Sequence, residues 1–171
     1  MLDVTTAPFR RLCRLLTRRA MLYTEMIPAA ALCHGRLAML THHPVEHPLT
    51  LQLGGGEPAE LARAAALAAD CGFAAINLNA GCPSDRVQQG CFGAVLMKDL
   101  PHLVRCYEAM AEACALPVTV KTRIGVDELD SPSFTQSLVA ALKAAGCRLI
   151  VLHARRCLLH GLNPRDNRRV P

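Results

Sequence analysis

Short apolar runs alternate with longer segments of helical periodicity along most of the chain. Each run is bounded by glycine, proline or polar residues, and most are rich in β-branched or leucine side chains, a pattern typical of buried strands. The predicted strands cover residues 21–27, 49–55, 74–81, 117–125 and 149–155.

Three segments between these strands have the spacing of amphipathic helices, at residues 57–72, 101–115 and 131–146. Their ends carry the expected signals. Ser131 precedes Pro132 as an N-cap, and Gly72 follows the first helix as a stop. Strand–helix–strand repeats of this kind predict right-handed βαβ units and therefore a parallel sheet.

Two α/β architectures fit that alternation, a (β/α)8 barrel and a doubly wound sheet. No G-x-G-x-x-G follows the first predicted strand, which weakens the dinucleotide-binding form of the doubly wound sheet. The pattern alone does not separate the two architectures.

Polar residues gather in the strands or just after their carboxyl ends. In a parallel barrel these ends share one face, where active sites are built, so the arrangement predicts a site. The residues concerned are Gln52, Asn77, Asn79, Cys82, Lys121, Arg123, His153 and Arg155.

Lys121 and His153 interrupt apolar strands. Burying a lysine is costly unless it meets an anion or an acceptor, so Lys121 indicates a bound ligand. A solvated strand-end lysine and a hydrogen-bonded core histidine are the alternative interpretations. Gln52 has both a donor and an acceptor, and could bind the edge of an amide-like heterocycle.

Cys82 lies between Gly81 and Pro83, directly after a strand. A thiol with a pKa of about 8.5 can donate a proton at neutral pH, so Cys82 suits a general acid at least as well as a nucleophile. Cys91, nine residues later, is expected to be a bystander. Cysteines within helical patterns, such as Cys106, are expected to be small buried hydrophobes.

The chain has 171 residues, half of them apolar, and a net charge of +5, which is compatible with RNA binding. Its nine cysteines form no C-x-x-C pair, which argues against a zinc ribbon. No signal peptide and no 18-residue apolar run appear, so we expect a cytoplasmic protein without membrane or metal. The arginines at positions 10, 14 and 18 are expected to form a solvated helix face, and the three histidines of residues 41–47 a linker.

Several motifs together resemble the tRNA-dihydrouridine synthases, most closely their A-type branch. They are "MLDVTTAPFRRLCR", "MLYTEM", "HPLTLQLGG", "INLNAGCPSDRVQQGCFGAVLM", "VTVKTRIGVDELDS" and "VLHARRCLLHGLNPRDNRRVP". The resemblance implies an FMN-dependent barrel that reduces uridines in the tRNA D-loop to 5,6-dihydrouridine, with NADPH recharging the flavin. It implies that Cys82 protonates C5 after hydride reaches C6.

The same resemblance assigns residues to ligands. It implies that flavin contacts come from Met1, Gln52, Lys121 and His153. It implies that tRNA contacts come from Asn79, Arg165 and Arg168. A solvated charge run remains the alternative interpretation of the C-terminal arginines.

The family's barrel has eight strands in roughly 250 residues, whereas this chain has five predicted strands, matching the family's second to sixth. We therefore expect residues 1–171 to be an incomplete flavin-binding barrel domain, without the first strand, the last two strands and the C-terminal helical domain. Weak FMN binding and little turnover are expected of the chain alone. A catalytically inactive remnant that binds RNA or partners, and a flavin oxidoreductase of small pyrimidines, are the alternatives. The oligomeric state is left open.

Overall fold

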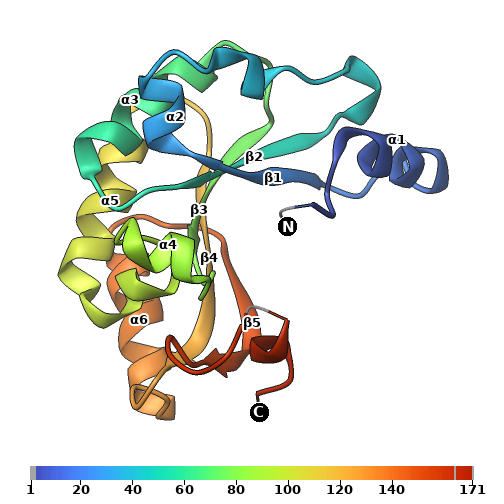
Figure 1. Cartoon of the computed structure of the whole chain (residues 1–171). Coiled ribbons are helices and arrows are strands. Elements are labelled where there is room, and N and C mark those ends of the chain that lie inside the picture. Colours follow the sequence, from blue (N-terminus) through green and yellow to red (C-terminus); the bar gives the residue numbers. More distant parts are fainter. Residues whose placement is uncertain (1–2, 164, 171) are drawn as a thin grey trace.

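A single parallel sheet is the centre of the molecule (Figure 1). The computed structural model describes residues 3–163 and 165–170. Met1, which was predicted to contact the flavin, lies outside the described residues. In the described part the sheet has five strands in the order β1-β2-β3-β4-β5, and every pair of neighbours is parallel. The strands are β1 (Leu22–Pro28), β2 (Leu49–Gly54), β3 (Ala75–Ala80), β4 (Val118–Val126) and β5 (Ile150–Cys157).

The strand order decides between the two architectures that the sequence leaves open. Each strand pairs with the next one in the chain, so the winding never reverses. A doubly wound sheet needs such a reversal, whereas a (β/α)8 barrel does not. The sheet is not closed, since β1 and β5 each have one strand neighbour within the described residues. The fold is a partial barrel, as predicted.

The three predicted helices are confirmed as α3 (Pro58–Ala69), α5 (Leu100–Ala113) and α6 (Pro132–Ala144). Ser131 caps α6 by accepting from the Phe134 N–H at 3.1 Å. A helix also forms at the arginine-spaced segment, as α1, whereas the shorter elements were not predicted, because a few residues give too little periodicity. Helix α1 covers Ala7–Leu16, and the shorter elements are α2 (Ala29–Cys33), α4 (Asp85–Gln89) and the 3₁₀ helices η1 (Leu37–Leu40), η2 (Pro44–Glu46), η3 (Gly93–Lys98) and η4 (Asp166–Arg168).

The two faces of the sheet differ in chemistry. Leu51 and Leu53 of β2 and Leu78 of β3 are fully buried in the apolar core. Helices α3, α5 and α6 lie along one side of the sheet (Figure 1). Because side chains alternate along a strand, the residues between these leucines face the barrel interior, and they are polar.

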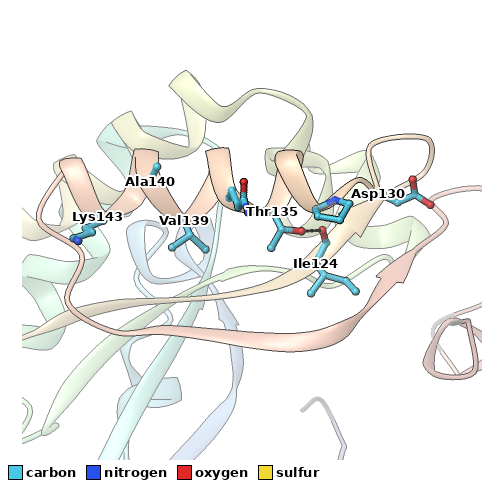
Figure 2. Close-up of a pocket in the computed structure, with 8 residues that line it drawn as sticks. Ile124, Asp130, Thr135, Val139, Ala140 and Lys143 are labelled. Atoms are coloured by element: carbon cyan, nitrogen blue, oxygen red, sulfur yellow. Dashed lines mark hydrogen bonds between the residues drawn. The ribbon is translucent and has the colours of Figure 1, made fainter.

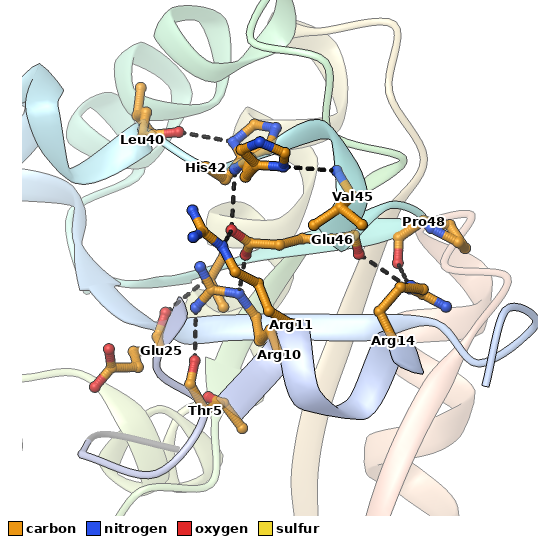
Figure 3. Close-up of polar contacts among 12 residues, drawn as sticks. Thr5, Arg10, Arg11, Arg14, Glu25, Leu40, His42, Val45, Glu46 and Pro48 are labelled. Carbon is orange, nitrogen blue, oxygen red and sulfur yellow. Dashed lines mark hydrogen bonds and ion pairs between the residues drawn. The ribbon is translucent and has the colours of Figure 1, made fainter. Parts of the chain in front are cut away.

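The prediction that Arg10 and Arg14 form a solvated face is wrong. Both side chains are buried, whereas Arg18 is exposed. Arg10 donates through Nε to the Glu46 carboxylate at 2.5 Å (Figure 3). Arg14 donates through Nη2 to the carbonyls of Glu46 at 3.0 Å and Pro48 at 3.1 Å. Helix α1 is thus anchored by its arginines, because the chain before β2 offers acceptors that helical spacing alone does not reveal.

Burial of the arginines leaves the apolar side of α1 outward. Leu15 and Leu16 are 82% and 81% exposed. Figure 1 shows α1 apart from the other helices, beyond the beginning of β1. The histidine segment before β2 has a structural task, since His43 accepts from Val45 N–H and its own N–H donates to Glu46. The hydrogen bond from the His43 N–H fixes the Glu46 carboxylate, which is the acceptor for Arg10.

Candidate active site

The predicted polar positions lie in rows across the inner face of the sheet. In the lowest row, Gln52 of β2 is level with Asn77 of β3, which is level with Thr119 of β4. One step nearer the carboxyl ends, Asn79 is level with Lys121. One step further, Arg123 is level with His153 of β5, and Cys82 is the second residue after β3. Residues level in a parallel ladder point to the same face, so the rows form one surface.

A hydrogen-bonded chain of amides forms the floor of this surface. Gln52 Nε2 donates to Asn77 Oδ1 at 2.8 Å, and Asn77 Nδ2 donates to Thr119 Oγ1 at 2.9 Å. All three side chains are buried. Buried amides are tolerated only when their polar atoms are paired, and this chain pairs them across three strands. Thr119 was not singled out from the sequence, since a threonine within a strand is common.

Asn79 connects the floor to the cysteine loop, residues 81–94. Its Nδ2 donates to Gln52 Oε1 at 2.9 Å, while its Oδ1 accepts from the backbone N–H groups of Gly81 and Cys82 at 3.0 and 2.9 Å. Both ends of the amide are therefore engaged within the protein. The structure places Asn79 on the inner face, where its side chain orients Cys82, and its contact with tRNA stays a prediction.

Cys82 is half-buried, and its Sγ lies 3.5 Å from Ser84 Oγ. The carbonyl of Cys82 accepts from the Ala94 N–H at 2.9 Å, which closes the loop. Gly93 has a φ of +70°, and a Cβ there would lie 2.6 Å from the Cys82 carbonyl oxygen. The loop can therefore close on Cys82 only because position 93 carries no side chain. Cys91 is exposed.

The side-chain nitrogens of Lys121 and His153 lie at the site without a hydrogen-bond partner among the described residues. Neither forms a hydrogen bond or an ion pair with any residue in 3–163 or 165–170, and both are half-buried. Burial lowers the pKa of Lys121, and the nearby Arg123 guanidinium lowers it further. Burial also lowers the pKa of His153, as do the positive charges of Arg123 and Lys121. Positive side chains are thus grouped on this surface, and an anionic or electron-rich ligand would be bound favourably there.

The predicted tRNA contacts Arg165 and Arg168 are exposed on the segment after β5. Asn167, between them, is fully buried, and its carbonyl accepts from Arg123 Nη1 at 3.0 Å. Two arginines of β5 make contacts within the protein. Arg155 donates to the Val170 carbonyl, and Arg156 forms an ion pair with Asp130. The side chains of Arg165 and Arg168 have no hydrogen bond or ion pair with another described residue.

The residues on the inner face fit the ring system of a flavin. An amide has two N–H groups, and Gln52 uses one toward Asn77 within the described residues, so it retains a donor. Lys121 presents a partly buried ammonium without a carboxylate partner among residues 3–163 and 165–170. A flavin ring edge carries carbonyls and nitrogens that such donors can meet. Lys121, Gln52 and His153 are the groups that would hold it.

An open pocket elsewhere does not belong to this site (Figure 2). It lies against α6, where Thr135 Oγ1 donates to the Ile124 carbonyl at 2.6 Å, and Val139 and Lys143 are among its other lining residues. None of the polar residues of the inner face lines it.

The remaining cysteines show how an unused thiol is placed. Burial raises the pKa of Cys106 to about 11, and burial also raises that of Cys157 to about 11. All nine cysteines are free.

Across the described chain, no three histidine, cysteine or acidic side chains are grouped as metal ligands. Nor does a helix in that part have the length and apolar character needed to span a membrane.

Comparison with known proteins bears on this surface. The family model described as "Dihydrouridine synthase (Dus)" matches residues 1–170. The chain is 50% identical over 171 residues to the tRNA-dihydrouridine(20/20a) synthase of Shewanella oneidensis, covering 100% of this chain and 51% of that protein. Identity is 49% over 172 residues with the Yersinia pestis protein of the same name, covering 100% of this chain and 50% of the relative. The chain thus spans about half the length of the curated relatives it matches.

A solved structure supports the fold alone. A crystal structure of 2,3-dimethylmalate lyase, of the PEP mutase/isocitrate lyase superfamily, matches with a TM-score of 0.56 at 19% sequence identity. The match covers 85% of this chain and 52% of that structure. The motifs around Cys82, Lys121 and His153 thus lie on one face of a barrel segment, and the family model spans nearly every residue. The chain belongs to the dihydrouridine synthase (Dus) family.

Proposed function

We propose that this chain forms the catalytic face of an FMN-dependent tRNA-dihydrouridine synthase, with NADPH as the reductant and D-loop uridines as the substrate. One observation carries the proposal. The backbone N–H of Cys82 donates to Asn79, which is level with Lys121 on the inner face of a partial barrel. The curated relatives are named tRNA-dihydrouridine(20/20a) synthases, which supports the same substrate class.

Each residue has a defined task in this reaction. Reduced flavin, when bound, supplies the hydride that adds to C6 of the uracil. Cys82 donates a proton from Sγ to C5, where negative charge develops, so a thiol rather than a thiolate is the required form. Lys121 and His153 bind the electron-rich ring edge of the cofactor, and Gln52 orients it through its remaining N–H.

The uridine must leave the tRNA fold to reach Cys82, which costs unstacking energy of a few kcal/mol. Arg165 and Arg168 offset this cost by binding the phosphates next to the target, and this contact weakens as salt increases. Cytoplasmic tRNA is the partner that this chemistry requires.

The test transplants this chain in place of the matching half of the Shewanella oneidensis relative. The hybrid is produced in bacteria lacking dihydrouridine synthases, and dihydrouridine is quantified in digested tRNA by mass spectrometry. We expect dihydrouridine from the hybrid and none from its Cys82→Ser variant, whose flavin content stays unchanged. A folded, flavin-loaded hybrid without product would indicate an inactive remnant, and reduction of free uracil in place of tRNA would indicate a small-pyrimidine enzyme.

A further inference from the structure

The carbonyl groups of the residues on both sides of Cys82 accept hydrogen bonds from two side chains, Arg123 of β4 and Gln88 of the cysteine loop. Arg123 Nε donates to the Gly81 carbonyl at 3.1 Å. Gln88 Nε2 donates to the Pro83 carbonyl at 2.9 Å. Cys82 therefore lies between two residues whose carbonyl groups are fixed by these two side chains.

The same two side chains also reach the end of β5 and the segment that follows it. Arg123 Nη1 donates to the carbonyls of Arg156 at 3.1 Å and Asn167 at 3.0 Å. Gln88 Nε2 donates to the Leu159 carbonyl at 2.6 Å. Each nitrogen involved has enough hydrogens to make its bonds separately, since Nη1 and Nε2 carry two and Nε carries one. Arg123 and Gln88 together form what we call the carbonyl clamp.

The far end of the clamp is itself fixed by Asn167. Its Oδ1 accepts from the Leu158 N–H at 2.8 Å, and its Nδ2 donates to the carbonyls of Leu158 at 2.9 Å and Leu162 at 3.2 Å. Asn167 is fully buried, although Arg165 and Arg168 beside it are exposed. A displacement of this arginine-bearing segment therefore moves the carbonyls that the clamp holds.

We propose that Arg123 and Gln88 are positioning residues that couple the arginine-bearing segment after β5 to the position of the Cys82 thiol. The biological role of this coupling rests on the proposed function. In that function, phosphate binding at Arg165 and Arg168 would fix the position of the Cys82 thiol, which is the proton donor. The clamp acts only through backbone carbonyls, so it changes where the thiol lies without contacting Sγ. Buried Arg123 has no carboxylate partner among the described residues, so its three carbonyl acceptors account for its hydrogen bonding there.

The experiment measures iodoacetamide alkylation of each cysteine in the purified 171-residue chain by peptide mass spectrometry. Gln88→Ala should raise the alkylation rate of Cys82 at least about fivefold, because the loop opens locally more often. Asn167→Ala should also raise it, although the Asn167 side chain contacts only its own segment. Arg123→Lys, which retains the charge and some donors, should give a smaller rise than Arg123→Met.

Three comparisons within the same samples keep the result specific. Gln89→Ala is the matched control, since Gln89 is exposed on the same helix and should leave Cys82 unchanged. Cys91 is already exposed and reports intrinsic thiol reactivity, while buried Cys106 reports global opening. A Cys82 rate that stays at the wild-type value in both Gln88→Ala and Asn167→Ala would overturn the proposal. So would an equal rise at Cys82 and Cys106. Neither outcome affects the Cys82→Ser activity test, so failure of the coupling and failure of the proposed function are distinguishable.

Discussion

Asn79 accepts the backbone N–H of Cys82 at 2.9 Å and at the same time donates to Gln52 at 2.9 Å. The loop that carries the thiol is thereby joined to the buried floor of the sheet. A loop anchored in this way holds its position because the sheet below it is rigid, which is how parallel barrels place reactive groups.

The Asn79 junction predicts a measurable loss of stability on substitution. Asn79→Ala removes one donor and one acceptor, leaving Gln52 Oε1 and two backbone N–H groups without their partner, so the free energy of unfolding should fall by about 2 kcal/mol. Asn79→Asp keeps the acceptor and should lose less. Urea denaturation followed by circular dichroism checks both values, and an equal loss in the two variants would contradict this role of the Oδ1 atom.

The amide chain of the floor predicts a difference between two small substitutions at Thr119. Thr119→Val has a similar shape but leaves Asn77 Nδ2 without its acceptor, at a cost of about 1–3 kcal/mol. Thr119→Ser retains the hydroxyl and should cost less than the valine variant. The measurement is again the free energy of unfolding in urea, and a valine variant as stable as the serine variant would argue against the pairing.

Arg10 and Arg18 were predicted to share one solvated stripe, but burial of Arg10 predicts that the two arginines differ in their effect on stability. Arg10→Met leaves the Glu46 carboxylate buried without its closest partner and should destabilise the fold by about 3 kcal/mol. Arg18→Met, at an exposed position, should change stability by less than about 0.5 kcal/mol. Thermal unfolding of the two variants side by side tests this, and equal melting temperatures would be inconsistent with the buried pair.

Glu46 predicts a specific loss of stability in acid. Burial by itself would raise the pKa of Glu46, but the His43 N–H and the Arg10 guanidinium together hold it below the usual 4.5. A carboxylate with a lowered pKa contributes its full stability above that usual value, and the contribution disappears as the pH falls through the lowered one. Stability should therefore decline below about pH 4.5 in the wild type.

The matched variant is Glu46→Gln, which cannot titrate. Its free energy of unfolding should be lower than that of the wild type at pH 7, and the gap should narrow in acid. Denaturation curves between pH 3 and pH 7 provide the test. A gap that stays constant with pH would show that the charge of Glu46 has no part in the effect.

The outward leucines of α1 predict a substitution without a folding cost. Leu15 and Leu16 are more than four-fifths exposed, so Leu15→Lys with Leu16→Lys should change the free energy of unfolding by less than about 0.5 kcal/mol. The double variant should aggregate less, because an apolar patch is removed. Light scattering at increasing concentration measures this. The contrast is Leu51→Ala in the core, which should cost about 2–5 kcal/mol.

Local pattern alone was enough to predict the strands and the long helices. Residues 117–125 were predicted as a strand and form β4 (Val118–Val126), since β-branched alternation within a run of nine residues depends on few long-range contacts. The positions of Gln52, Lys121, His153 and Cys82 at the carboxyl ends followed from the same pattern, because parallel strands must present those ends on one face.

Tertiary structure decided what local pattern could not encode. Arg10 and Arg14 have the spacing of a solvated stripe, yet Glu46, some thirty residues later, buries them. The clamp formed by Arg123 and Gln88 depends on carbonyls of residues 156–167, and no periodicity signals a backbone acceptor. The sequence by itself predicted the five strands, the three long helices and Cys82 as the candidate proton donor. Which polar side chains are bonded to one another, and how Cys82 is held, depended on contacts between segments far apart in sequence, because hydrogen bonds are set by positions in space.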